Sequence, residues 1–179
     1  TLIGALQRRK VYVNWPRPKR FDRNLIVIGA GAGGLVTAYI AAAVRARVTL
    51  VEDQKMGGDC LNYGCVPSKA LIRVAKLARD LQQADAMGIR DANGRIDFAA
   101  VMARVQRVIR DIEPHDSVER YTALGVDVVQ ARARITSPWS VELTRADGTV
   151  QTLTTRSIVI ATGARPFVPP IPGLQQAGF

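Results

Sequence analysis

The chain has 179 residues, is 47% hydrophobic and 22% charged, and carries 25 Lys or Arg against 15 Asp or Glu, a net charge of +10. This composition fits a soluble globular protein and excludes a disordered or collagen-like chain. Two cysteines exclude a disulfide-stapled secreted scaffold, and we expect neither a signal peptide nor a membrane span. One His and two Cys are too few for a closed zinc site without carboxylates, so we expect no metal.

The positive charge is concentrated at the start of the chain. Residues 1–23 carry seven Lys or Arg against one acidic residue, which accounts for +6 of the +10. Pro16 and Pro18 disfavour a regular helix, so we expect an extended linker or arm. It is either a solvated tail or a juxtamembrane segment facing an anionic surface. Because the remaining residues have an ordinary charge, we expect no nucleic-acid partner. The chain begins with Thr1 and not Met, and we expect it to be part of a longer protein.

A strand–turn–helix–strand unit follows the arm. Residues 25–28 form a short apolar run ending in glycine, which is typical of a strand buried on both faces of a parallel sheet. Residues 35–44 are apolar and Ala-rich, and predict a buried helix. Residues 48–52 predict the second strand. Two parallel strands joined through a helix form a right-handed crossover.

Two amphipathic helices occupy the middle of the chain. The apolar spacing predicts one over residues 68–81 and another over residues 98–112. Pro114 interrupts the second helix, and residues 116–124 predict a helical continuation beyond a kink. The single histidine, His115, lies at this kink, and we expect it to be a surface or packing residue.

Strands dominate the last third of the chain. Residues 126–135, 140–144 and 151–155 predict a small antiparallel meander, and residues 157–161 predict another buried parallel strand. Prolines beyond residue 165 indicate a departing linker. The sequence therefore predicts an α/β protein with a parallel sheet, helices and an antiparallel β-meander.

The glycines after the first strand form the pattern G-x-G-x-x-G, at Gly29, Gly31 and Gly34. Gly29 permits the tight turn, Gly31 lets a pyrophosphate approach the backbone, and Gly34 lets the helix lie close to the sheet. Glu52, at the end of the second strand, is placed to accept hydrogen bonds from an adenosine ribose. The pattern predicts a dinucleotide site, either for FAD or for NAD; the alternative is a Gly-rich turn without a ligand.

Both cysteines of the chain, Cys60 and Cys65, lie in a segment rich in glycine, with four residues between them. Metal binding is disfavoured, because zinc fingers favour two to four intervening residues together with a second ligand pair. A redox pair is favoured, with a distorted helix entry at Gly64 and Pro67. The helix start and Lys69 would lower the thiol pKa. The alternative is two unrelated thiols.

The segment 57–69, GGDCLNYGCVPSK, resembles the active-site signature of class I flavoprotein disulfide reductases, which include dihydrolipoamide dehydrogenase, mercuric reductase and glutathione reductase. It follows the glycine pattern at that family's usual distance. Ala161-Thr162-Gly163 with Pro166 resembles the family's second flavin contact. The resemblance covers residues 24–173. It implies a Rossmann-like FAD-binding domain over residues 24–165, after the arm (1–23) and before the start of a linker to a NAD(P)H domain (166–179).

The resemblance also implies roles for single residues. Cys60 matches the interchange thiol that attacks the substrate, and Cys65 matches the thiol next to the flavin. Lys69 matches the lysine near the reactive edge of the flavin. The positions that match or lie in the family's FAD contacts are Gly29, Gly31, Gly33, Gly34, Glu52, Gly58, Asp59, Cys60, Lys69, Ala131, Ala161, Thr162 and Gly163.

Three positions depart from the family pattern. Asp59 replaces the usual Thr, and a carboxylate beside a pyrophosphate is unfavourable unless it turns away or is hydrogen-bonded; it could also raise the neighbouring thiol pKa. Tyr63 replaces a smaller residue and would alter access to the cysteines. Ala131 replaces a Gly that often contacts the adenine through its backbone.

The resemblance implies an enzyme in which NAD(P)H reduces FAD, electrons pass to Cys60 and Cys65, and Cys60 reduces a small disulfide, dithiol or metal-thiolate substrate. It implies a homodimer when full-length, and a fragment that is inactive alone. We expect a cytoplasmic location, with membrane association through an upstream segment as an alternative. Two rival functions stay open: a non-catalytic flavin-binding redox sensor, and a membrane-surface or nucleic-acid binder that uses the basic arm.

Overall fold

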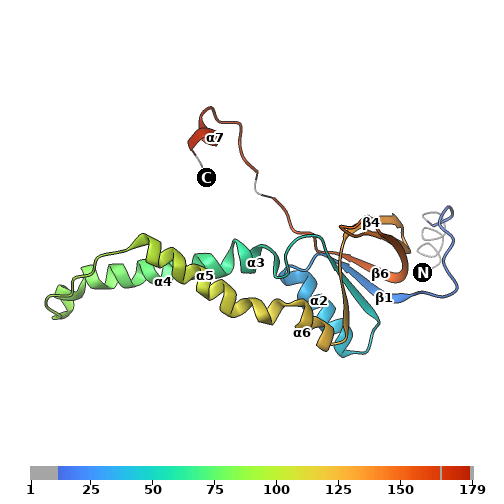
Figure 1. Cartoon of the computed structure of the whole chain (residues 1–179), viewed down its shortest axis with the longest axis horizontal. Helices are drawn as coiled ribbons and strands as arrows, with labels where there is room; N and C mark the ends of the chain where they lie inside the picture. Colours follow the sequence, from blue (N-terminus) through green and yellow to red (C-terminus); the bar gives the residue numbers. More distant parts are fainter. Residues whose placement is uncertain (1–11, 166, 178–179) are drawn as a thin grey trace, which may run out of the picture.

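The computed structural model describes residues 12–165 and 167–177, and its centre is one six-stranded sheet (Figure 1). The strand order is β3-β2-β1-β6-β5-β4. The elements, in chain order, are β1 (Arg23–Ile28), α2 (Ala32–Ala43), β2 (Val48–Glu52), α3 (Gly58–Asn62), α4 (Cys65–Gln82), the 3-10 turn η1 (Ala84–Met87), α5 (Phe98–Ile112), the 3-10 turn η2 (Glu113–Asp116), α6 (Val118–Ala123), β3 (Val126–Gln130), β4 (Arg132–Ser137), β5 (Ser140–Thr144), β6 (Val150–Ile160) and α7 (Leu174–Ala177).

The sheet has a parallel half and an antiparallel half that share β6. Strands β3, β2, β1 and β6 pair in parallel, with Leu25 opposite both Val48 and Ser157. Strands β4, β5 and β6 form the antiparallel meander, with Val141 opposite Leu153. The predicted fold class, a parallel sheet with helices and a small antiparallel meander, is therefore confirmed.

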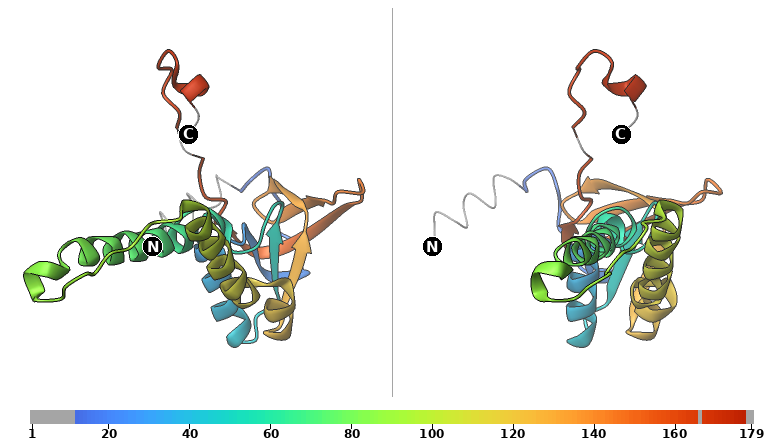
Figure 2. Two further views of the ribbon diagram at one scale, coloured as in Figure 1. Left: turned by 60° about the vertical axis from the view of Figure 1, so that its left-hand side comes forward. Right: turned by 90° about the vertical axis from the view of Figure 1, so that its left-hand side faces the viewer.

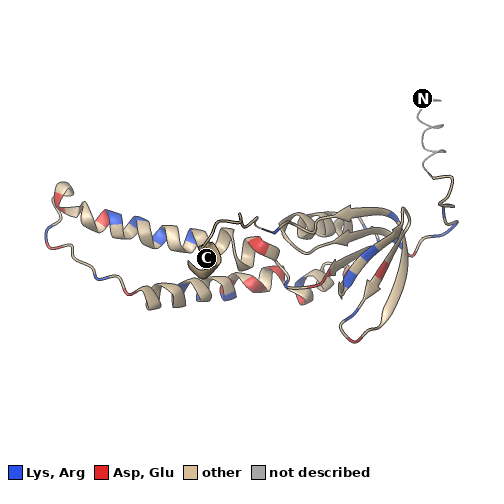
Figure 3. Ribbon diagram, turned by 90° about the horizontal axis from the view of Figure 1, so that it is seen from above, with Lys and Arg blue, Asp and Glu red and all other residues tan. Residues whose placement is uncertain are grey.

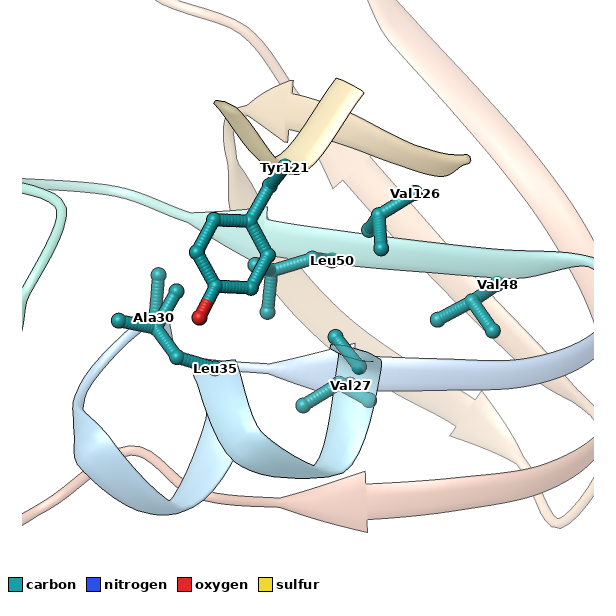
Figure 4. Close-up of a cluster of buried hydrophobic side chains, with 8 residues drawn as sticks. Val27, Ala30, Leu35, Val48, Leu50, Tyr121 and Val126 are labelled. Atoms are coloured by element: carbon teal, nitrogen blue, oxygen red, sulfur yellow. The ribbon is translucent and has the colours of Figure 1, made fainter. Parts of the chain in front are cut away.

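The parallel strands are buried on both faces, as their continuous apolar sequences predict. On one face, α2 and α6 cover the strands, and Leu35 and Tyr121 pack against Val27 and Leu50 (Figure 4). A second cluster joins the parallel strands to the meander; its members are Ile26, Val51, Val129, Ala131, Val141, Leu143 and Leu153. All five residues of β2 are buried as a result.

Helices α4 and α5 form a long hairpin that projects from the body of the molecule (Figure 2). Only Ala70 in α4 and Val105 in α5 are buried. Large apolar side chains on the hairpin are exposed, among them Ile72 and Phe98. Among the described residues, no helix combines the length and apolarity that crossing a bilayer requires.

Several element boundaries differ from the sequence-based predictions. The strand predicted over residues 126–135 is two strands, because the chain leaves β2 at Gln130 and pairs with β5 from Arg132 onward. The strands predicted over residues 151–155 and 157–161 are the single strand β6, whose two halves have different partners. Helix α4 begins at Cys65, three residues earlier than predicted. The kink at Pro114 is confirmed, as the turn η2 between α5 and α6.

The first part of the basic arm, residues 1–11, lies outside the described residues. From Tyr12 onward the arm contacts the meander: the rings of Tyr12 and Trp139 lie 5.2 Å apart, and the Asp22 carboxylate accepts a hydrogen bond from the Thr154 backbone N–H at 2.8 Å. At the other end, the described residues beyond Gly163 leave the sheet and contain only the short helix α7 (Figure 1).

Candidate functional site: a nucleotide loop beside a cysteine pair

The glycine loop after β1 is packed backbone against backbone. Gly29 has φ +102, and its N–H donates to the Val51 carbonyl at 2.7 Å. A Cβ on Gly29 would lie 2.3 Å from the Ala161 oxygen, and a Cβ on Gly34 would lie 1.8 Å from the Gly29 oxygen. Both positions therefore require glycine, the first because of its left-handed φ and the second because of close contact.

A second loop, between β2 and α3, closes against the first. The Gly57 N–H donates to the Ala30 carbonyl at 2.9 Å, and a Cβ on Gly58 would lie 2.6 Å from the Gly31 Cα. Asn62 holds this second loop, since its Nδ2 donates to the carbonyl oxygens of Met56 (3.1 Å) and Gly58 (2.9 Å). Asn62 belongs to the cysteine motif, but no role for its side chain was predicted from the sequence.

Glu52 is buried at the end of β2, and its carboxylate binds backbone. One oxygen accepts from the Ala30 N–H at 2.7 Å and the other from the Gln54 N–H at 2.8 Å. The sequence predicted only that Glu52 accepts hydrogen bonds from a ribose. In the structure, its carboxylate also holds the backbone of the two loops in place. Because each oxygen can accept a second hydrogen bond, these contacts leave capacity for a ribose hydroxyl.

The two loops border a cavity of about 690 Å³ at the carboxyl ends of the parallel strands. This is the edge where α/β sheets bind ligands, and the volume is in the range of ligand sites. It is lined by these predicted site residues: Gly29, Gly31, Gly33, Glu52, Gly58, Asp59, Cys60, Ala131, Ala161, Thr162 and Gly163. Three predicted residues do not line it: Gly34 is buried under the loop, and Cys65 and Lys69 lie on α4.

The cavity fits an extended dinucleotide. Helix α2 begins at its wall and has no side-chain cap, so the N–H groups of its first turn are free for a phosphate. At Gly33 a Cβ would meet nothing within 4 Å, and at Gly31 only Gly58 at 3.8 Å, which leaves the backbone open to a ligand. Three cationic residues that line the cavity were not predicted from the sequence: Lys55, Arg132 and Arg165. Only their closeness in sequence to predicted site residues could have indicated them.

A larger cavity, of about 750 Å³, lies between α4, α5 and the segment that joins them. It contains no residue of either glycine loop and neither cysteine. The candidate nucleotide site is therefore the smaller cavity, which is bordered by the helix α2 N-terminus and by Cys60.

The two cysteines are on separate helices that meet at Gly64. Cys60 lies in the short helix α3 and is half-buried, whereas Cys65 is the first residue of α4 and is exposed. The N–H groups of Tyr63 and Gly64 both donate to the Asp59 carbonyl, at 2.9 and 2.6 Å, and this ends α3. Of the two residues expected to distort the helix entry, Gly64 does so, whereas Pro67 lies within the first turn of α4. Both cysteines are free thiols.

The Cys65 thiol affects the ionisation of Cys60. A hydrogen bond with Cys65, then burial, raises the pKa of the Cys60 thiol above its ordinary value, while the positive charge of Lys69 acts in the opposite direction. The expectation of a lowered thiol pKa is therefore wrong for Cys60, because the neighbouring thiol outweighs Lys69. The cause is not Asp59, whose side chain is exposed at the rim of the cavity. Tyr63 is 69% exposed and also lines the cavity.

Fold and site together define an α/β nucleotide-binding protein with a dithiol at its cavity. The family of pyridine nucleotide-disulphide oxidoreductases matches residues 23–179, and the chain belongs to this family. The resemblance stated from the sequence is thereby confirmed, and with it FAD as the cofactor of this class of protein and NAD(P)H as its electron donor.

Similar curated proteins have three different names. The chain is 33% identical to a dihydrolipoyl dehydrogenase from Bacillus subtilis, 33% identical to a glutathione reductase from Burkholderia cepacia, and 28% identical to a mercuric reductase from Staphylococcus aureus. These matches cover 87–88% of the chain but only 28–34% of the relatives. The chain therefore spans about a third of the length of the curated relatives it matches.

A solved structure also resembles the chain. It is a Cu(II) complex of a cysteine-to-serine mutant of RclA, an HOCl-induced flavoprotein disulfide reductase from Escherichia coli. The TM-score is 0.67 at 26% identity, over 88% of this chain and 32% of the other.

Proposed function

We propose that the chain forms the FAD-binding part of a flavoprotein disulfide reductase, which passes electrons from NAD(P)H through FAD to Cys60 and Cys65 and on to substrate. The observation that carries the proposal is the position of Cys60, which lines the same cavity as the two glycine loops. Cys65 lies close enough to Cys60 for its thiol to raise the pKa of Cys60. A dithiol at the wall of a dinucleotide site can exchange electrons with the bound cofactor without moving far.

The binding roles follow from the backbone geometry. The first turn of α2 would hold the pyrophosphate through its free N–H groups. Glu52 would accept a hydrogen bond from the ribose while its present contacts keep the loop in place. Ala131, at the junction of β3 and β4, and Ala161-Thr162-Gly163, after β6, would contact the remainder of the cofactor.

The thiol roles follow from position. FAD, when bound, supplies the two electrons that convert a Cys60–Cys65 disulfide, with one proton, to a thiol and a thiolate. Cys60 attacks one sulfur of a substrate disulfide, which forms a mixed disulfide and releases the first substrate thiol. Cys65 then attacks Cys60, which restores the protein disulfide and releases the second. Lys69, one turn along α4 from Cys65, favours the Cys60 thiolate by its charge.

The substrate class is a small disulfide, dithiol or metal thiolate, because the curated relatives are named as dihydrolipoyl dehydrogenases, glutathione reductases and mercuric reductases. We further propose that the full-length enzyme is a cytoplasmic homodimer, and that this chain alone does not turn over. Its one histidine, His115, is exposed in η2 and does not line the cavity beside Cys60.

The test is absorbance spectroscopy of the full-length protein supplied with FAD. We expect a yellow flavoprotein whose two-electron-reduced form has a long-wavelength charge-transfer band. Cys65→Ser abolishes that band, whereas Lys76→Ser, an exposed substitution further along the same helix, leaves it. A colourless protein defeats the FAD assignment, and a band that survives Cys65→Ser defeats the role of Cys65.

The second candidate function is a non-catalytic redox sensor, which the interacting free thiols also favour. Steady-state oxidation of NAD(P)H with lipoamide, oxidised glutathione or mercuric ion separates the two functions. Multiple turnovers support the enzyme. A single stoichiometric reduction of the cysteines, without turnover, supports the sensor.

A further inference from the structure

The described part of the arm and one end of the meander form a surface that the redox chemistry does not use. We call it the arm surface, and it consists of residues 12–21 with Arg47, Trp139 and Arg156. The Trp139 indole N–H donates to the Trp15 carbonyl at 3.3 Å, and the ring of Trp139 lies 5.2 Å from Tyr12 and 6.0 Å from Phe21. These contacts hold the arm in a defined position.

Three arginines gather around Phe21. The guanidinium of Arg17 lies 5.6 Å from the centre of the Phe21 ring, and that of Arg156 lies 5.8 Å from the same ring. Arg47 donates to the Phe21 carbonyl at 3.0 Å. Three guanidinium groups placed around one residue give this part of the surface a positive charge.

The positive site has little internal compensation. None of the three arginines forms an ion pair within 4 Å among the residues that the structure describes. The neighbouring acid Asp22 accepts hydrogen bonds from the Thr154 N–H (2.8 Å) and hydroxyl (2.7 Å). These two hydrogen bonds, more than the nearby arginines Arg23 and Arg47, lower the pKa of Asp22. Lys19 and Arg20 are exposed on the same segment and add positive charge (Figure 3).

Exposed apolar groups lie beside the positive charge. Val13 is 72% exposed, Trp15 is 43% exposed and Tyr12 is 38% exposed. Tyr and Trp favour the boundary between water and lipid headgroups, where one part of the ring is apolar and the other wet. Basic residues beside such rings are the composition of surfaces that bind anionic membranes.

We propose that the arm surface docks the protein on an anionic phospholipid membrane, with Arg17, Arg47 and Arg156 at the headgroups and Val13 and Trp15 in the interface. The charge is complementary, since each Lys or Arg near an anionic leaflet strengthens binding about five-fold. Binding of single-stranded nucleic acid requires free aromatic faces for the bases. Here, guanidinium groups and neighbouring rings already occupy positions over Phe21 and Trp139, which disfavours that partner.

The arm surface contains both tryptophans of this chain, Trp15 and Trp139, so intrinsic fluorescence reports on it directly. The experiment adds vesicles to the FAD-loaded protein and measures the emission maximum and cosedimentation. We expect a blue shift and cosedimentation with vesicles that contain phosphatidylglycerol, no binding to pure phosphatidylcholine, and release at high salt. Trp15→Phe and Trp139→Phe assign the shift to one ring.

Charge variants distinguish the arm surface from general positive charge. The double variant Arg17→Gln/Arg156→Gln weakens vesicle binding about 25-fold, five-fold for each charge. The control, Arg73→Gln/Lys76→Gln, removes the same charge from exposed positions on α4 and leaves binding unchanged. An unchanged flavin spectrum shows that each variant is folded. Absence of binding to the anionic vesicles, equal weakening by both double variants, or displacement from vesicles by single-stranded DNA at similar affinity overturns the proposal.

Discussion

The two halves of the molecule that meet at the cysteine pair are built differently. On one side, the loops after β1 and β2 pack backbone against backbone, and a Cβ at Gly34 would lie 1.8 Å from a carbonyl oxygen. On the other side, the α4–α5 hairpin projects from the body with one buried residue in each helix. Cys60 belongs to the side of the loops, whereas Cys65 begins the hairpin.

The difference shows where sequence is constrained. At Gly29, Gly34 and Gly58 a single added methyl group has no space, because the nearest atoms belong to the backbone and cannot move aside. On the hairpin most side chains face solvent or the cavity between the helices, so many substitutions are tolerated. The two cysteines therefore lie where the tightly packed loops meet a helical hairpin that tolerates substitution. Four measurements test this comparison.

The largest effect is expected in the glycine loop. Gly34→Ala forces α2 away from β1, and we expect it to destabilise the protein by about 3 kcal/mol, the upper end of the cost of overpacking. The control is its neighbour, Gly33→Ala, where a Cβ meets nothing within 4 Å. It is stabilising by up to about 1 kcal/mol, since Ala is preferred to Gly in helices. Urea unfolding followed by circular dichroism measures both, and equal midpoints would contradict the packing argument.

The next largest loss of stability is expected at Glu52, whose carboxylate connects the end of β2 to the glycine loop. Glu52→Gln replaces one accepting oxygen by an NH₂ group and leaves a buried backbone N–H without a partner, at a cost of about 1–3 kcal/mol. Asp53→Asn, at the exposed neighbouring position, is the matched control and changes stability little. The same unfolding measurement applies. If both variants lose the same stability, the Glu52 hydrogen bonds do not fix the loop.

In helix α5, we expect a substitution at one position to lower the stability of the protein and a substitution at another to change it very little. Val105 is 1% exposed, and Val105→Ala costs about 2 kcal/mol from lost burial and the cavity left behind. Phe98, at the start of the same helix, is 70% exposed, so Phe98→Ala changes stability by less than about 0.5 kcal/mol. The comparison of the two midpoints tests the expected tolerance; a larger loss at Phe98 would show that its exposed ring is covered in the folded protein.

The smallest effect is a change in reactivity without a change in fold. Cys65→Ala removes the hydrogen bond that raises the pKa of Cys60, so the pH at which Cys60 becomes reactive decreases toward the ordinary value of a thiol. Lys69→Gln removes a favourable charge, and that pH increases. Iodoacetamide labelling of the Cys60 peptide across a pH series, read by mass spectrometry, measures both. Shifts of the opposite sign would show that Cys65 does not control Cys60.

Much of the nucleotide half could be predicted from sequence, because its signals are local. The apolar runs of β1 and β2, the glycine pattern and the paired cysteines each specify a structure within a few residues. What could not be predicted depends on partners distant in sequence. The segment predicted as one strand over residues 126–135 is two strands, because its first half pairs with β2 and its second half pairs with β5. No local sequence pattern marks this change of pairing partner.

The candidate site shows the same limit. Cys60, Glu52, Gly29, Gly31 and Gly33 line one cavity, although the sequence did not show that Glu52 accepts hydrogen bonds from the Ala30 and Gln54 N–H groups. The raised pKa of Cys60 depends on the orientation of two side chains on different helices, and spacing alone favoured the opposite direction. The contacts of the arm with Trp139 join residues more than a hundred positions apart, which composition cannot reveal.

The shared strand β6 has a consequence for biosynthesis. Leu25 in β1 pairs with Ser157 in β6, which the ribosome adds 132 residues later (157 − 25). At translation rates of 5–20 residues per second, β1 waits on the order of ten seconds for this neighbour. During that interval one side of a highly apolar strand has no native partner, so the nascent polypeptide is expected to need chaperone protection until β6 has emerged.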